Sequence, residues 1–323
     1  MKKGLLMLGA AAMMLASCTQ NEVVEVAESR AIGFNGTGID NITKADITST
    51  GFNQFYVYGG YGDNAVFNKI SVTKSGQNWG YSPTQYWANG TWNFAGYAGG
   101  NGVTPTWDNA TGTLTLAINS NANNQDDVIF AANKSITVTD ATTYNTPVTL
   151  NFTHLLSKIQ FKFTKEVASL GGVTVKLTNF KVAALKTNAK WTDGVQSTAD
   201  APETGDYSDF TEAKEIDGTN GLSTAEFYVI PQDVSAFAIT ADAEITDVNS
   251  SNIKTGTVTA TVPTTGITKW APQTKYVYTA ELKYENIVTE DPSNDPKPIE
   301  FTGSTSGWTT GSTGTITPNT PQP

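Results

Sequence analysis

Lys158–Thr164 reads KIQFKFT, with Ile159, Phe161 and Phe163 at every second position. Side chains of a β-strand alternate between two faces, so this pattern predicts a strand with one buried face. The same period recurs in Tyr276–Leu282, whereas no stretch after residue 30 has the period of a long amphipathic helix. The sequence therefore predicts an all-β fold.

Further short β-rich runs are separated by Gly, Asn, Asp and Pro, a spacing typical of β-sandwiches. Asn89-Gly90 is a hairpin signal between two aromatic runs, and Thr187–Gly205 is polar enough to predict a long surface loop. We expect two tandem sandwiches, at residues 31–145 and 146–285, and a linker with a strand arm at residues 286–323. Residues 1–18 and 19–30 form a signal peptide and a propeptide strand.

Composition excludes several classes of protein. The 323 residues carry a net charge of −10, so nucleic acid is a poor partner. One histidine, His154, and one cysteine, Cys18, exclude an intrachain disulfide and a multi-Cys/His zinc site. His154 lacks a visible acid–base partner set, so we expect it to be structural and expect no cofactor and no enzyme. The composition does not exclude a glycosidase whose catalytic residues are all carboxylates.

The amino terminus carries an export signal. Lys2 and Lys3 precede an apolar stretch too short to cross a membrane as a helix, and Leu15-Ala16-Ser17-Cys18 resembles a bacterial lipobox. In such signals the cysteine is acylated and becomes the new amino terminus. We therefore expect a lipid on Cys18 and attachment to the outer membrane.

Arg30 is the only arginine among the 20 basic residues. It follows a β-branched segment, residues 21–29, and precedes the run that begins at Ala31. This position predicts cleavage between Arg30 and Ala31 by an arginine-specific protease. A surface charge without a role is the plainer alternative, and Lys44 is a second candidate for the cleavage site.

The carboxy-terminal tail follows an acidic, proline-bearing linker. It contains Ile299, Phe301 and Trp308, for which we find no domain of their own to pack in. The composition of Gly303–Pro323 predicts poor order in an isolated subunit. These side chains are therefore candidates for a donor strand that pairs with a neighbouring subunit.

Four tryptophans of the amino-terminal half can be interpreted in two ways. Trp79, Trp87, Trp92 and Trp107 could form a platform on which sugars stack, or they could be core residues. The core interpretation is favoured for Trp87 and Trp92. Trp79 and Trp107 lie in polar surroundings and remain candidates for a sugar site.

Several short motifs appear in an order that resembles the fimbrillin family, the type V pilins and their relatives. They are Phe55–Tyr58, the pair Tyr86-Trp87 with Trp92–Tyr97, Asp127–Ala131, Phe152–Ile159 (FTHLLSKI), Ile230–Gln232, Trp270–Pro272 with Tyr276–Tyr278, and Ile299–Phe301 with Trp308. Each motif alone is weak, but together with the lipobox cysteine they extend from residue 18 to residue 308.

The resemblance implies two transthyretin-like β-sandwiches in an outer-membrane lipoprotein precursor. A surface protease would remove the lipidated strand, and a strand of the next subunit would fill the vacated groove to build a head-to-tail pilus. Expected partners are other pilin subunits, the protease and a host or bacterial surface ligand. The alternative function is a monomeric glycan-binding surface lipoprotein.

Overall fold

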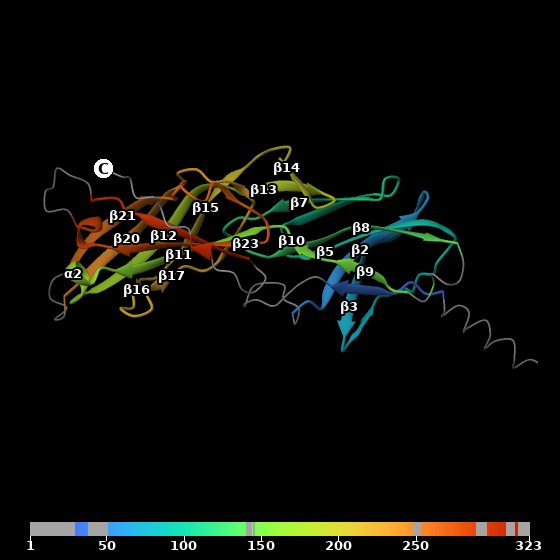
Figure 1. Ribbon diagram of the computed structural model, residues 1–323, viewed down its shortest axis with the longest axis horizontal. Coiled ribbons are helices and arrows are strands. Elements are labelled where there is room, and N and C mark those ends of the chain that lie inside the picture. The colour runs from blue at the N-terminus through green and yellow to red at the C-terminus, as the bar shows by residue number, and fades with distance from the viewer. Residues whose placement is uncertain are drawn as a thin grey trace, which may run out of the picture.

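The computed structural model describes residues 30–37, 51–139, 144, 146–247, 253–288, 296–307 and 314–315. Nearly all regular structure there is β-strand, which confirms the all-β prediction. The molecule is elongated, with the blue strands near the amino terminus at one end and the orange strands β20 and β21 at the other (Figure 1). None of the described helices is long and apolar enough to cross a membrane.

A six-stranded sheet forms the centre of the amino-terminal part, in the order β10-β8-β5-β2-β3-β4. Its strands are β10 (Thr153–His154), β8 (Val128–Val138), β5 (Gly90–Gly99), β2 (Gln54–Tyr61), β3 (Asn64–Ser75) and β4 (Asn78–Gly80). The expected Asn89-Gly90 hairpin is wrong, because β5 pairs with β2 and β8, and the run before it pairs with the segment around Ala31.

Both faces of this sheet are covered. On one face lie β1 (Phe34–Thr37) and β9 (Val148–Asn151), which pair in parallel over a core that includes Phe55 and Trp92. On the other face lies a sheet in the order β14-β13-β7-β6. Its strands are β14 (Val195–Ser197), β13 (Asn188–Thr192), β7 (Thr113–Asn119) and β6 (Val103–Asp108).

The carboxy-terminal part is a sandwich around one core. One sheet has the order β17-β11-β23-β24-β25 and the other β15-β12-β20-β21. The strands are β17 (Leu222–Ser223), β11 (Ser157–Lys165), β23 (Thr274–Leu282), β24 (Phe301–Gly307), β25 (Gly314–Thr315), β15 (Thr204–Asp209), β12 (Thr174–Lys186), β20 (Ala238–Thr246) and β21 (Ile253–Thr261). Smaller elements are β16 (Lys214–Glu215), β18 (Phe227–Val229), β19 (Gln232–Asp233), β22 (Lys269–Trp270), the helix α2 (Val167–Leu170) and the 3-10 turn η2 (Tyr284–Asn286).

A hairpin joins the two parts. Only Thr187 separates β12 of the carboxy-terminal sandwich from β13, which pairs with β7 of the amino-terminal part. The long loop expected at Thr187–Gly205 is therefore wrong. Asp193 and Gly194 adopt φ values of 48° and 80°, the left-handed geometry of a two-residue turn that returns the chain as β14.

The FTHLLSKI motif runs through all three cores. Phe152 packs in the first core, Leu155 and Leu156 in the middle one and Ile159 in the carboxy-terminal one. Because eight consecutive residues hold three packing layers together, the motif fixes how the two parts meet.

Candidate functional site

Arg30 is exposed and lies four residues before Phe34, the first residue of β1. Its Nη2 donates a hydrogen bond to the hydroxyl of Tyr144 at 3.1 Å, and the guanidinium carbon lies 5.0 Å from the centre of the same ring. The side chain is thus held by one aromatic residue while it stays accessible from solvent.

The backbone around the predicted cleavage site is paired. Trp87 N donates to the Arg30 carbonyl at 2.9 Å, Ile32 N donates to the Gln85 carbonyl at 2.9 Å, and Ala31 bridges Tyr86 in antiparallel fashion. The structure thus brings Arg30 and Ala31 together with residues 85–87, which the sequence did not link to them.

Residues after Ala31 belong to the fold. The side chain of Ile32 is 2% exposed and that of Phe34 is 3% exposed. The Phe34 ring makes edge contacts with Phe67 at 5.2 Å and Phe94 at 5.6 Å. A cut after Arg30 would therefore leave β1 anchored in the amino-terminal core.

The two-stranded sheet β1–β9 has outer edges with which the backbone of another strand could pair. Phe34 faces Val148 and Thr37 faces Asn151 in parallel register. Among the described strands, β1 and β9 pair only with each other, so each has an outer edge to which a further strand could add. An added strand is the mode of binding that pairs backbone with backbone.

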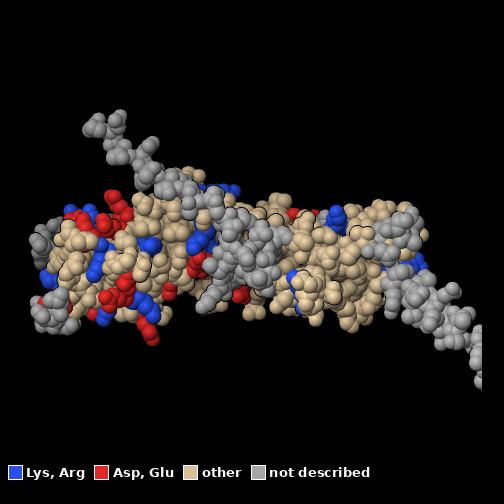
Figure 2. All heavy atoms as spheres, turned by 60° about the horizontal axis from the view of Figure 1, so that its bottom comes forward, with Lys and Arg blue, Asp and Glu red and all other residues tan. Residues whose placement is uncertain are grey.

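Charge is distributed unevenly. The face in Figure 2 shows charged side chains gathered over the carboxy-terminal part and few over the rest. Residues 51–139 contain seven acidic or basic residues: Asp63, Lys69, Lys74, Asp108, Asp126, Asp127 and Lys134. Contacts made by the amino-terminal part would therefore rest on uncharged side chains and backbone pairing more than on ion pairs.

Ile299 and Phe301 lie in the core of their own sandwich, at 5% and 6% exposure. Ile299 N donates to the Thr259 carbonyl at 2.8 Å, and β24 pairs with β23 from Phe301 onward. The segment thereby crosses from one sheet to the other. The expectation that these two side chains lack a domain was wrong, because the sandwich is incomplete without them.

The structure does not describe some of the other residues that the sequence singled out. Cys18, the segment of residues 19–29, Lys44 and Trp308 lie outside the described residues. Gly314 and Thr315 of β25 pair with β24, so the described chain continues as one more strand at the edge of this sheet.

The four tryptophans do not share one surface. Trp87 and Trp92 are 3% and 0% exposed, which confirms their core assignment. Trp79 is half-buried against Phe52 in the first core, and Trp107 is half-buried in the middle core on the opposite face of the six-stranded sheet. A platform made of all four rings is excluded.

His154 is buried, and its Nδ1 lies 2.9 Å from a carboxylate oxygen of Asp127. The pair links β10 to the residue that precedes β8 and so fixes the chain where it leaves the amino-terminal part. This geometry agrees with a structural role.

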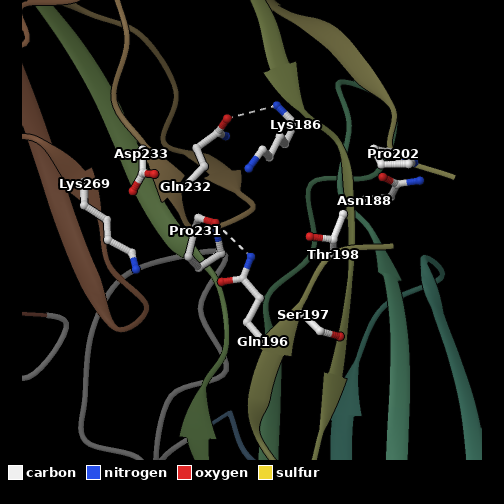
Figure 3. Close-up of a pocket in the computed structure, with 11 residues that line it drawn as sticks. Lys186, Asn188, Gln196, Ser197, Thr198, Pro202, Pro231, Gln232, Asp233 and Lys269 are labelled. Atoms are coloured by element: carbon white, nitrogen blue, oxygen red, sulfur yellow. Dashed lines mark hydrogen bonds between the residues drawn. The ribbon is translucent and has the colours of Figure 1, made fainter. Parts of the chain in front are cut away.

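A polar pocket of about 240 Å³ lies where the two parts meet, between β13–β14 and β19–β22 (Figure 3). Gln196 Nε2 donates to the Pro231 carbonyl at 2.8 Å across it, and Lys186 N donates to Gln232 Oε1 at 3.1 Å. These bonds add to the β7–β13 pairing, so the pocket is part of a stiff junction.

The fold resembles solved structures of bacterial surface proteins. A fimbrial protein from Bacteroides vulgatus is 16% identical with a TM-score of 0.62, and the alignment covers 87% of this chain and all of that one. A candidate cell adhesion protein from Bacteroides ovatus is 14% identical with a TM-score of 0.49, over 87% of this chain and 98% of that one. No curated protein sequence matches the chain.

The profile of one protein family matches residues 22–295, which is most of the chain. The match includes Arg30, the β1–β9 sheet and the FTHLLSKI motif. The family is structural rather than catalytic. The chain belongs to the fimbrillin-like family.

Proposed function

We propose that this chain is a structural subunit of an adhesive cell-surface pilus. It is exported as a lipoprotein through Cys18, matured by cleavage between Arg30 and Ala31, and polymerised by strand exchange. Membership in the fimbrillin-like family supports the location at the cell surface and the assembly with other pilin subunits.

One observation carries the proposal: the single arginine is exposed and lies four residues before β1. Ile32 and Phe34, directly after it, are core residues. A cut there would release the lipidated segment and leave every described strand in place.

The acceptor in this proposal is the β1–β9 sheet. A strand from a neighbouring subunit would pair with one of its outer edges, and its alternate side chains would face the adjoining core. Since Ile299 and Phe301 are core residues of their own sandwich, we assign the donor role to the tail beyond Gly307, which contains Trp308. Among the described strands, Gly314 and Thr315 of this tail pair only with the edge of β24, and they would leave that edge to pair with the neighbouring subunit.

The test compares three variants in cells: Arg30→Ala, Arg30→Lys and Lys44→Ala. Both Arg30 variants should accumulate as uncleaved lipoprotein without filaments, because an arginine-specific protease rejects alanine and lysine alike. Lys44→Ala should assemble normally. Intact mass and electron microscopy give the readouts, and normal pili from Arg30→Ala would refute the maturation step.

A further inference from the structure

The backbone groups that a protease needs near Arg30 are already engaged. Proteases stabilise the carbonyl oxygen of the scissile bond with hydrogen-bond donors, and here the Arg30 carbonyl accepts from Trp87 N at 2.9 Å. Two residues on, Ile32 N donates to Gln85, and the Ile32 carbonyl accepts from the Tyr81 hydroxyl at 2.8 Å. The same backbone groups cannot bond to the fold and to a protease at the same time.

The side chain is engaged as well. A protease that selects arginine must take the guanidinium into its own pocket, whereas Tyr144 holds it by a hydrogen bond and by its ring. Tyr81 is itself fixed, since its ring makes an edge contact with Phe34 at 5.5 Å and its oxygen accepts from Gln85 N at 3.2 Å.

We propose that Gln85–Trp87, Tyr81 and Tyr144 form a processing latch that sets the rate of cleavage after Arg30. The protease acts on molecules in which residues 30–32 have separated from the latch, and water then cleaves the amide to leave a carboxylate on Arg30 and an ammonium on Ala31. This inference rests on the proposed cleavage at Arg30.

Opening of the latch is local. Arg30 is exposed and Ala31 is half-buried, so only Ile32 must leave a buried position, while the buried Phe34 and the pairing of β1 with β9 hold the chain beyond it. The protease therefore meets a small opening at the edge of the fold, and segments of this kind open far more often than the core unfolds. The rate of cleavage after Arg30 therefore depends on the fold of the precursor and not only on the residues around the cleaved bond.

The test digests the precursor, purified in detergent, with an arginine-specific endoprotease under native conditions. Because Arg30 is the only arginine, intact mass reports a single cut. A synthetic peptide of residues 25–36 gives the rate without the latch, and the precursor should be cut at least about tenfold more slowly, since two backbone bonds and the tyrosine contacts must break first.

Three variants separate the contributions. Tyr81→Phe loses the bond to Ile32 and should raise the rate roughly two- to tenfold, and Tyr144→Ala should raise it roughly two- to fivefold. Tyr56→Phe is the matched control, because Tyr56 packs against the middle core on the opposite face of the six-stranded sheet and its ring contacts Lys69, outside the latch. Thermal unfolding checks that each variant is folded, and Tyr144→Phe keeps the ring as a milder second variant.

A precursor cut as fast as the peptide, or unchanged rates for Tyr81→Phe and Tyr144→Ala, would overturn the latch. Amino-terminal sequencing of pili from cells tests the proposed function separately. Mature protein that starts at a residue other than Ala31 would refute cleavage at Arg30 in the cell and leave the in vitro result as it stands.

Discussion

Nζ of Lys158 lies 2.8 Å from Oε2 of Glu226, and the lysine side chain is 2% exposed. Lys275 binds the other oxygen of the same carboxylate. Lys158 belongs to the FTHLLSKI motif, and its strand β11 pairs with β18 just after Glu226. The ion pair therefore fixes the first strand of the carboxy-terminal sandwich at the junction between the two parts.

Glu226→Ala should destabilise the protein by about 3 kcal/mol, because it removes the carboxylate beside a buried ammonium. Lys275→Ala should cost about 1 kcal/mol or less, since that side chain is 25% exposed and its loss leaves Lys158 in place. Urea unfolding followed by tryptophan fluorescence measures both. Equal losses for the two variants would contradict the assignment of Lys158 as the buried partner.

The same carboxylate predicts a pH dependence. Burial opposes ionisation of Glu226, but hydrogen bonds from Lys158 and Lys275 and their charges hold its pKa below the ordinary value of 4.5. A lowered pKa adds stability above pH 4.5 that is lost as pH falls through the folded-state value. Unfolding free energies measured downward from neutral pH should show this loss, and Glu226→Gln should flatten it. Glu212→Gln, at an exposed site, is the control.

Trp191 tests the junction hairpin. It is 1% exposed in the middle core, so Trp191→Ala should cost about 3–5 kcal/mol and let the two parts unfold in separate transitions. Val195→Ala, on the neighbouring strand at 71% exposure, should change stability by less than about 0.5 kcal/mol. Calorimetry distinguishes one transition from two, and a single unshifted transition for Trp191→Ala would rule out the hairpin as the link.

Local alternation was enough to predict β11, β23 and the all-β class, because one face of each strand is buried. The junction hairpin escaped the sequence analysis although Asp193-Gly194 is a turn signal of the two-residue kind. Its short flanking runs are polar, and only pairing with β7 from a distant part of the chain makes them strands.

The candidate site, too, could be predicted only in part from the sequence. The rarity of arginine and its position after a β-branched segment single out Arg30, but its contacts with Trp87 and Tyr144 join residues far apart in sequence, and no local pattern predicts them. Ile299 and Phe301 were assigned to a neighbour because the acidic linker before them looked like a boundary. Composition cannot show that the chain returns after such a linker to complete its own sandwich.

Anchoring is tested at Cys18. Cys18→Ala should abolish lipidation and retention at the outer membrane, because acylation of this residue is the membrane signal in the sequence. Metabolic labelling with a fatty-acid analogue, followed by fractionation, gives the readout. A labelled Cys18→Ala protein would rule out the lipoprotein assignment.

The last prediction separates folding from assembly in the carboxy-terminal tail. Deletion of residues 299–323 removes β24 and two core side chains, so the carboxy-terminal sandwich should unfold or aggregate. Deletion of residues 308–323 keeps β24 and should give a folded, cleavable monomer that cannot polymerise.

Two point variants in β24 compare a buried side chain with its exposed neighbour. Phe301 packs against Phe161 and Phe163 at 5.6 and 5.7 Å, so Phe301→Ala should cost about 3–5 kcal/mol of stability. Thr302 is exposed on the other face, and Thr302→Ala should cost less than about 1 kcal/mol. Thermal unfolding and electron microscopy after cleavage measure stability and assembly in turn. Filaments of normal length from the 308–323 deletion would place the donor strand outside the tail, because that protein retains every core residue that the structure describes and loses, of the described strands, only the edge strand β25.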